Sequence, residues 1–157
     1  TQNRYSLAGQ SSTTDGYASG GDYSGLPGSV NIDKFSFSSS GNASDWGDLS
    51  QARVGTTGQS STTDGFTSGG YPNVNVIDTF PFAAPSGSVD HGDLAIVHHA
   101  FSSTSSTTHG YTAGGYGPVA PAWHNSINKF AFASNTTAAD HGDLTLSNNH
   151  TGAGLHY

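Results

Sequence analysis

The stretch Ser61-Thr-Thr-Asp-Gly-Phe-Thr-Ser-Gly-Gly70 opens a unit that the chain contains three times. The same unit continues with Ile77-Asp-Thr-Phe-Pro-Phe82 and ends with Asp90-His-Gly-Asp-Leu94. The equivalent blocks begin at Ser12, Ile32 and Asp45 in the first copy, and at Ser106, Ile127 and Asp140 in the third. The spacing of equivalent residues gives a repeat of about 47 residues, so the fold is built from repeated units.

The length differences between the copies are confined to one loop. Segments 22–29, 71–75 and 116–126 differ in length and are rich in Gly and Pro. In contrast, the spacing from Phe37, Phe82 or Phe132 to the glycine of the following Gly-Asp-Leu is the same in all three copies. This pattern predicts a scaffold with fixed spacings and one variable loop per repeat.

The composition excludes several classes of protein. Only 32% of the 157 residues are hydrophobic, and the repeats share them, so a single large core is not expected. The chain has 4 Lys+Arg against 11 Asp+Glu, which makes a nucleic-acid partner improbable. It has no Cys and no run of 18 apolar residues, so we expect neither a disulfide framework nor membrane insertion. We expect no cofactor.

Each repeat is predicted to form about four short strands, which makes the chain all-β. In the first copy the strands are expected at residues 4–8, 17–19, 31–38 and 46–52. Asp15-Gly16 predicts a tight hairpin turn, and Gly20-Gly21 predicts a bend or a close backbone approach. Phe35 and Phe37 share one face of the third strand, and Ile32 lies on the other.

We interpret residues 1–157 as one repeat domain. Its units are repeat 1 at 4–52, repeat 2 at 53–97, repeat 3 at 98–147 and a partial repeat at 148–157. Residues 148–157 align with residues 4–13, the start of the first repeat. This additional opening strand favours a fragment of a longer repeat array.

The repeat resembles the kelch repeat of β-propellers in its four short strands, its Gly-Gly after the second strand and its variable loop before an aromatic third strand. Arg4 and Arg53 before the first strand, and Trp46 with Leu49 near the fourth, fit the resemblance. It implies kelch-like β-propeller blades. In the other two repeats His91 and His141 replace Trp46. A β-solenoid is the alternative architecture.

The repeat is also similar to the Ser/Gly-rich repeats of virion and tail-fibre proteins of marine bacteriophages. The segments that carry this likeness are Ser-Ser-Thr-Thr-His-Gly-Tyr-Thr-Ala-Gly-Gly at 105–115 and the stretch from Phe132 to Leu144. The likeness implies a structural or host-attachment protein, located in a virion or otherwise outside the cell. Its partners would be other copies of itself or other virion proteins.

Two histidine-containing patterns are candidates for metal binding. In the Asp-His-Gly-Asp motif, an imidazole and two carboxylates within four residues could bind Zn²⁺ or Ca²⁺. The candidate ligands are Asp90, His91, Asp93, Asp140, His141 and Asp143. Because Trp46 replaces the histidine in the first copy, a packed ring beside a turn is the favoured interpretation. A site from His98, His99 and His109 is also conceivable, but a solvated histidine pair is favoured.

Aromatic residues in the variable loops are the better candidates for ligand binding. Aromatic faces stack on sugar rings, and neighbouring polar groups can bind the hydroxyls. The candidates are Tyr23, Tyr71, Tyr116, Trp123 and His124. The alternative interpretation is that these rings only cover the ends of the sheets.

An enzyme is not expected, because the chain has no Glu and no G-x-S-x-G or phosphate-loop motif. The sequence therefore predicts a non-enzymatic virion structural or receptor-binding protein, such as a tail-fibre component. The alternatives are a secreted lectin-like module that binds a cell-surface glycan and a subunit of an extracellular filament.

Overall fold

The computed structural model describes residues 3–23, 28–99, 102–118, 120 and 122–146. These residues form 12 strands in three four-stranded antiparallel sheets and contain no helix, so the all-β prediction is confirmed. No described segment is a helix long and apolar enough to cross a membrane. The strands of the first sheet are β1 (Ala8–Ser11), β2 (Asp15–Ser19), β3 (Ser29–Ser36) and β4 (Ser44–Arg53).

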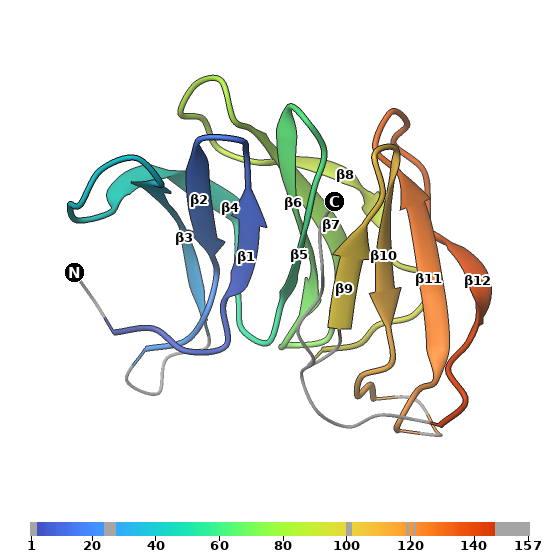
Figure 1. Ribbon diagram of the computed structural model, residues 1–157. Helices are drawn as coiled ribbons and strands as arrows, with labels where there is room; N and C mark the ends of the chain where they lie inside the picture. Colours follow the sequence, from blue (N-terminus) through green and yellow to red (C-terminus); the bar gives the residue numbers. More distant parts are fainter. Residues whose placement is uncertain (1–2, 24–27, 100–101, 119, 121, 147–157) are drawn as a thin grey trace.

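The second and third sheets repeat the first. The second contains β5 (Thr57–Ser60), β6 (Asp64–Gly70), β7 (Val74–Pro81) and β8 (Val89–Asp93). The third contains β9 (Ser102–Ser105), β10 (His109–Ala113), β11 (Ser126–Ala131) and β12 (Ala139–Asp143). In each sheet every strand pairs with the next one along the chain. The sheets lie side by side in chain order, with the first strands β1, β5 and β9 next to one another (Figure 1).

Two local sequence predictions about the first sheet are wrong. The opening strand β1 begins at Ala8, and of residues 4–7 only Tyr5 is paired, in an isolated bridge with Asp22. The predicted turn at Asp15-Gly16 is instead the beginning of β2. The turn lies just before it, where the Ser12 hydroxyl accepts the N–H of Thr14 at 3.2 Å and that of Asp15 at 3.0 Å. Serine thus supplies the turn chemistry.

The glycine of each Asp-Gly pair makes room for a phenylalanine ring. Gly16 lies opposite Phe35 on the neighbouring strand, and a Cβ at Gly16 would lie 2.3 Å from the tip of that ring. Gly65 and Gly110 have the same relation to Phe80 and Phe130. Any side chain here would displace the ring, so the glycine is required for packing.

The double glycines adopt a left-handed backbone, as the predicted bend requires. The φ angles are 66° at Gly20 and 91° at Gly21, and the pairs in the other two repeats are also positive. The bend brings the chain against the next repeat, where the Gly21 N–H donates to the carbonyl oxygen of Arg53 at 3.0 Å.

The apolar side chains form two small clusters, one at each junction between neighbouring sheets. The first junction contains Tyr17, Trp46, Ile32, Leu49, Phe80 and Phe82. The second contains Phe66, Ile77, Leu94, Phe130, Phe132 and Ala138. The predicted alternation is confirmed. Ile32 packs in the junction that follows its sheet, whereas the phenylalanines of the second and third sheets pack in the junction that precedes their own sheet. The described residues form no single large core, in agreement with the low apolar content.

A polar seam joins the first strands of neighbouring sheets. The side-chain amide of Gln10 donates to the Ser19 hydroxyl at 2.8 Å and to the Thr67 hydroxyl of the next sheet at 2.9 Å. The Ser11 N–H donates to the Ser60 hydroxyl at 2.9 Å, and the Ser60 N–H donates to the Ser105 hydroxyl at 3.0 Å. The abundant Ser and Thr therefore satisfy buried polar groups between the sheets.

Candidate functional site

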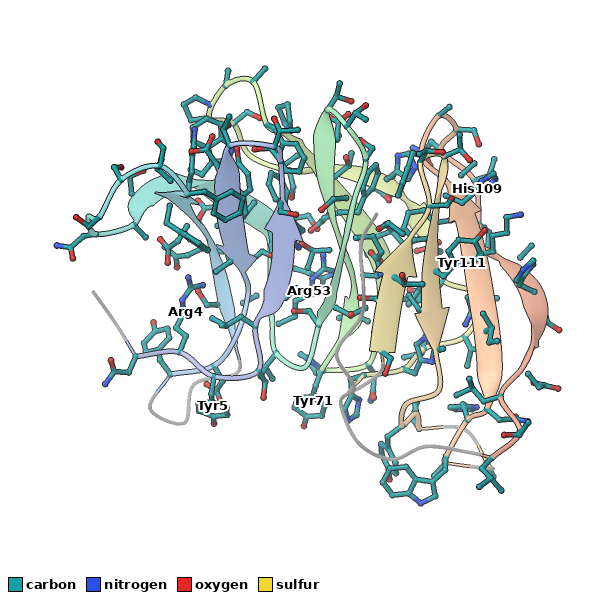
Figure 2. All side chains as sticks on the ribbon, viewed as in Figure 1. Arg4, Tyr5, Arg53, Tyr71, His109 and Tyr111 are labelled. Carbon is teal, nitrogen blue, oxygen red and sulfur yellow. The ribbon has the colours of Figure 1, made fainter. Side chains whose placement is uncertain are left out.

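An exposed row of rings lies along one edge of the three sheets. In each repeat, the residue after the double glycine forms an isolated bridge with the residue that follows Arg4, Arg53 or His98. The pairs are Tyr5–Asp22, Val54–Tyr71 and His99–Tyr116. Figure 2 shows Tyr5 and Tyr71 projecting from the same edge. The repeat thus places a residue pair at this edge once in every sheet, and most members carry a ring.

Four of these rings are in contact and form what we call the aromatic row: Tyr71, His99, Tyr116 and Trp123. The ring centroids are 5.7 Å apart for Tyr71 and His99, 5.4 Å for His99 and Tyr116, and 4.7 Å for Tyr116 and Trp123. The exposed fractions are 49% for Tyr71, 37% for Tyr116 and 43% for Trp123. The row therefore presents several apolar ring surfaces to solvent across two sheets.

Polar groups accompany these rings. Partial burial lowers the pKa of His99, so its imidazole is neutral at pH 7. At the first sheet the Tyr5 hydroxyl donates to the Asp22 carboxylate at 2.7 Å, and this bond together with the Asp22 charge raises the pKa of Tyr5. The edge combines ring faces with hydroxyl, imidazole and carboxylate groups.

The structure separates the ligand-binding residues that the sequence predicted. Tyr71, Tyr116 and Trp123 come together in the row, whereas Tyr23 is half-buried in the loop of the first sheet. His124 is buried, with its ring 6.1 Å from that of His98, so it is not a surface group. Sequence reasoning considered His99 only as part of a conceivable metal site and missed Tyr5. The signal that could have found them is their place in the repeat, because each directly follows the position that Arg4, Arg53 and His98 occupy in the three copies.

The prediction that His98 and His99 form a solvated pair is wrong. His98 is fully buried, and its burial, together with the nearby His124 and His99, lowers its pKa to about 4. His98 is thus a neutral ring packed in the interior at pH 7. His109, the third member of that conceivable metal site, hydrogen-bonds through Nδ1 to the Thr108 hydroxyl at 2.8 Å.

The Asp-His-Gly-Asp motif has a structural explanation in the second sheet. The His91 ring packs edge-on against Phe66 at 4.9 Å, and its Nε2 lies 2.9 Å from the carbonyl oxygen of Ala131 in the third sheet. Trp46 makes the same hydrogen bond, from Nε1 to the Pro81 carbonyl oxygen at 3.0 Å. The ring at this position therefore links one sheet to the next, whether it is indole or imidazole.

The first aspartate of the motif stabilises a bulge. Asp90 accepts the N–H of Gly92 at 2.7 Å, and Asp140 accepts that of Gly142 at 3.0 Å, at the point where the strand register shifts. Asp93 and Asp143 end their strands. Within the described parts of the chain, no three His, Asp or Glu side chains gather into a group that could hold a metal ion.

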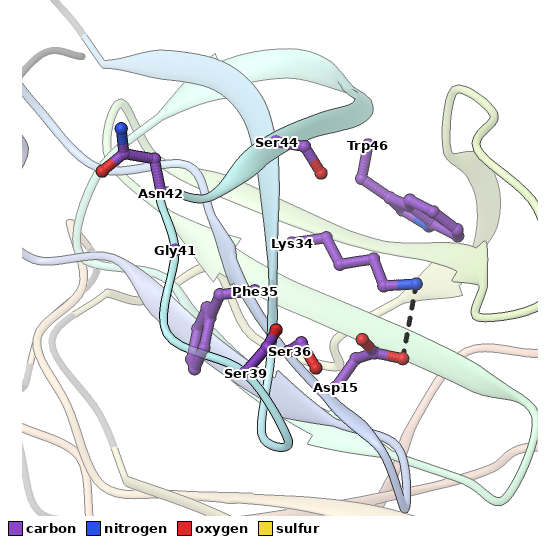
Figure 3. Close-up of a pocket in the computed structure, with 9 residues that line it drawn as sticks. All are labelled: Asp15, Lys34, Phe35, Ser36, Ser39, Gly41, Asn42, Ser44 and Trp46. Carbon is purple, nitrogen blue, oxygen red and sulfur yellow. Dashed lines mark ion pairs between the residues drawn. The ribbon is translucent and has the colours of Figure 1, made fainter.

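A pocket of about 240 Å³ lies at the β3–β4 hairpin of the first sheet (Figure 3). Its floor contains an ion pair between Lys34 Nζ and Asp15 Oδ2 at 3.3 Å, and Lys34 Nζ lies 4.3 Å from the centre of the Trp46 ring. A hydrogen bond from the Thr14 hydroxyl and the charge of Lys34 lower the pKa of Asp15. The remaining lining comprises Phe35, Ser36, Ser39, Gly41, Asn42 and Ser44. No sequence pattern pointed to this pocket, because Thr79 replaces Lys34 in the second repeat.

No protein-family model matches the chain, and a search of curated proteins finds no match.

Proposed function

We propose that this chain is a non-enzymatic receptor-binding protein of a virion, built from kelch-like β-propeller blades, that attaches to a cell-surface glycan through the aromatic row. The observation that carries the proposal is the contact series from Tyr71 through His99 and Tyr116 to Trp123. Three of these four rings are substantially exposed, although soluble proteins usually bury large aromatic side chains or use them in recognition.

The chemistry of the row suits a sugar. The apolar C–H face of a pyranose can cover an exposed ring, and its hydroxyls need nearby donors and acceptors. The phenol groups of Tyr71 and Tyr116 provide both. With 4 Lys+Arg and a net charge of -7, the chain is better suited to a neutral or cationic glycan than to a sulfated one.

The blade assignment and the virion setting have separate support. Three similar four-stranded antiparallel sheets, each ordered by chain sequence and joined through their first strands, are consistent with radially arranged blades. The similarity of the repeat to bacteriophage tail-fibre repeats leads to the virion. A chain without Cys or Met also has no thiol or thioether to oxidise outside a cell.

A broad glycan panel probed with the full chain tests the binding. We expect saturable binding to a limited group of glycans, and Trp123→Ala should weaken it at least ~10-fold, because an exposed aromatic ring that stacks on a sugar contributes more than ~1.4 kcal/mol. Val89→Ala is the matched control, because Val89 is an exposed apolar residue on β8, away from the row. Absence of binding across the panel, or equal weakening by both variants, would contradict the glycan proposal.

A further inference from the structure

The two junctions between sheets are built in the same way. In the first, Phe82 stacks on Tyr17 with ring centroids 4.8 Å apart and planes 20° apart. In the second, Phe132 stacks on Phe66 at 4.6 Å and 19°. Together with the ring-to-carbonyl hydrogen bonds of Trp46 and His91, these contacts define one junction geometry that occurs twice. At each junction the later sheet contributes a phenylalanine pair, and the earlier sheet receives it.

Among the described residues, no sheet lies against the corresponding side of the first sheet. We call its phenylalanine pair, Phe35 and Phe37, the front pair. They are 43% and 58% exposed, whereas Phe80 and Phe130, the equivalents of Phe35, are 0% and 2% exposed. The two front-pair rings lie 6.0 Å apart at 74°, compared with 6.0 Å and 77° for Phe80 and Phe82. The exposed pair is therefore already in the arrangement that the buried pair adopts.

The third sheet carries the complementary surface, which we call the back face: Tyr111, Ile127, His141 and Leu144. The Tyr111 and His141 rings lie 5.5 Å apart at 58°, close to the 5.7 Å and 65° of Tyr17 and Trp46. His141 is exposed, and Ile127 and Leu144 are half-buried, whereas their equivalents Ile77 and Leu94 are fully buried. Tyr111 projects from the third sheet in Figure 2.

We propose that the front pair of one copy of this chain docks on the back face of a second copy, so that the row of sheets continues head to tail from one chain to the next. A second copy is the expected occupant because equivalents of these two surfaces already pack together at both junctions between consecutive sheets of the chain. Phe37 of the incoming copy stacks on Tyr111, and Phe35 packs against Ile127 and Leu144. The His141 ring donates to the carbonyl oxygen of Ser36, the equivalent of Pro81 and Ala131.

The geometry of the contact limits the size of the assembly. A head-to-tail contact is heterologous, so repeated addition of copies either closes a ring or continues as a filament. Propellers close with about four to eight blades, and six is the only multiple of three in that range. We therefore expect a closed ring of two copies. This expectation of size rests on the propeller assignment above, whereas the contact itself rests only on the two junctions.

Native mass spectrometry of the full chain, from about 1 to about 100 µM, tests the contact. We expect a species of about twice the 16.0 kDa chain mass. A mass of one chain across this range would overturn the proposal. Regular filaments would support the contact and contradict the ring, and hence the propeller assignment. If the chain is monomeric and still binds a glycan, the assembly proposal fails and the proposed function stands.

Two charged variants distinguish head-to-tail docking from a symmetric dimer. Phe37→Asp alters the front pair and Tyr111→Asp the back face, so each variant alone should be monomeric, with at least a ~100-fold weaker association. An equal mixture of the two should form a heterodimer, because the intact back of one meets the intact front of the other. Dimerisation of Tyr111→Asp alone would show front-to-front pairing and overturn the proposal. Val89→Asp should leave the assembly unchanged, because exposed Val89 is on the outermost strand of the middle sheet.

Discussion

The second and third sheets carry different chemistry at the same two positions of the repeat. At the second sheet, Arg53 Nη2 lies 2.7 Å from Asp78 Oδ2, and both side chains are fully buried. At the third sheet the equivalent residues are His98 and Asn128, which are also buried but carry no charge at pH 7. The arginine and the aspartate are replaced together, because either one left alone would be an unpaired buried charge.

The charged pair holds more of the structure. Arg53 also donates to the carbonyl oxygens of Val76 at 3.1 Å and Thr67 at 3.2 Å. Asp78 accepts the N–H and the hydroxyl of Ser50, both at 2.9 Å. Because Ser50 and Arg53 belong to β4 and Asp78 belongs to β7, the pair connects the first sheet to the second. The comparison shows that these two positions of the repeat can hold either a buried ion pair or two buried neutral side chains.

The largest expected effect is that of breaking the charged pair on one side. Arg53→Ala leaves the Asp78 carboxylate buried without its cation, so we expect the free energy of unfolding to fall by about 3–5 kcal/mol. Urea denaturation followed by circular dichroism measures it. Arg4→Ala is the matched control, since the equivalent partner Asp33 has a side chain that is 37% exposed and remains partly hydrated. An equal loss in both variants would contradict the importance of burial.

The buried imidazole of His98 should make the free energy of unfolding depend on pH. The folded-state pKa of His98 is about 4, below the ordinary value of 6.5, so its contribution is fully present above pH 6.5 and is lost as pH falls towards 4. The unfolded chain binds the proton first, and the difference of about 2.5 pKa units corresponds to a loss of about 3 kcal/mol.

Urea unfolding at pH 7 and at pH 4.5 measures this dependence, with His98→Gln as the control that cannot titrate at this position. The wild-type chain should lose more stability than the variant over this interval, because only the wild type has the buried imidazole. The rings nearest to His98 are His124 and His99, and both remain in the control. Equal losses in the two chains would show that His98 is not the titrating group.

The smallest expected effect is that of converting the Arg53–Asp78 pair into the His98 and Asn128 combination of the third repeat. The double variant Arg53→His with Asp78→Asn should lose about 1–2 kcal/mol, less than Asp78→Asn alone, which leaves the guanidinium buried and unpaired. A double-mutant cycle gives the coupling energy. Additive losses would mean that the two positions do not act as a pair.

Part of this organisation was predictable from the sequence. The alternation of Ile32 with Phe35 and Phe37 predicted a strand with two apolar faces, and the structure places these residues at opposite sides of the first sheet. The repeat also predicted four strands per unit. These predictions succeeded because a strand places successive side chains on opposite faces whatever it packs against.

Other features depend on contacts between distant residues and could not be read from spacing. The role of Gly16 follows from its register with Phe35, and the pair Asp-Gly has a more common local meaning in turns. The burial of His98 is determined by the neighbouring sheet, whereas its sequence resembles a solvated polar segment. Tyr71, Tyr116 and Trp123 were predicted as loop residues, but His99 could be placed between them only from the pairing of β-bridges.

The separation between the sheet junctions and the variable loops has a consequence for how such a chain can change. Insertions and deletions occur after the double glycines, at the edge that carries Tyr71 and Tyr116. The phenylalanine pair and the glycine beneath it belong to segments of constant spacing. Duplication of a whole repeat therefore reproduces a compatible junction in one genetic step, while the exposed edge is free to diversify between copies without loss of fit.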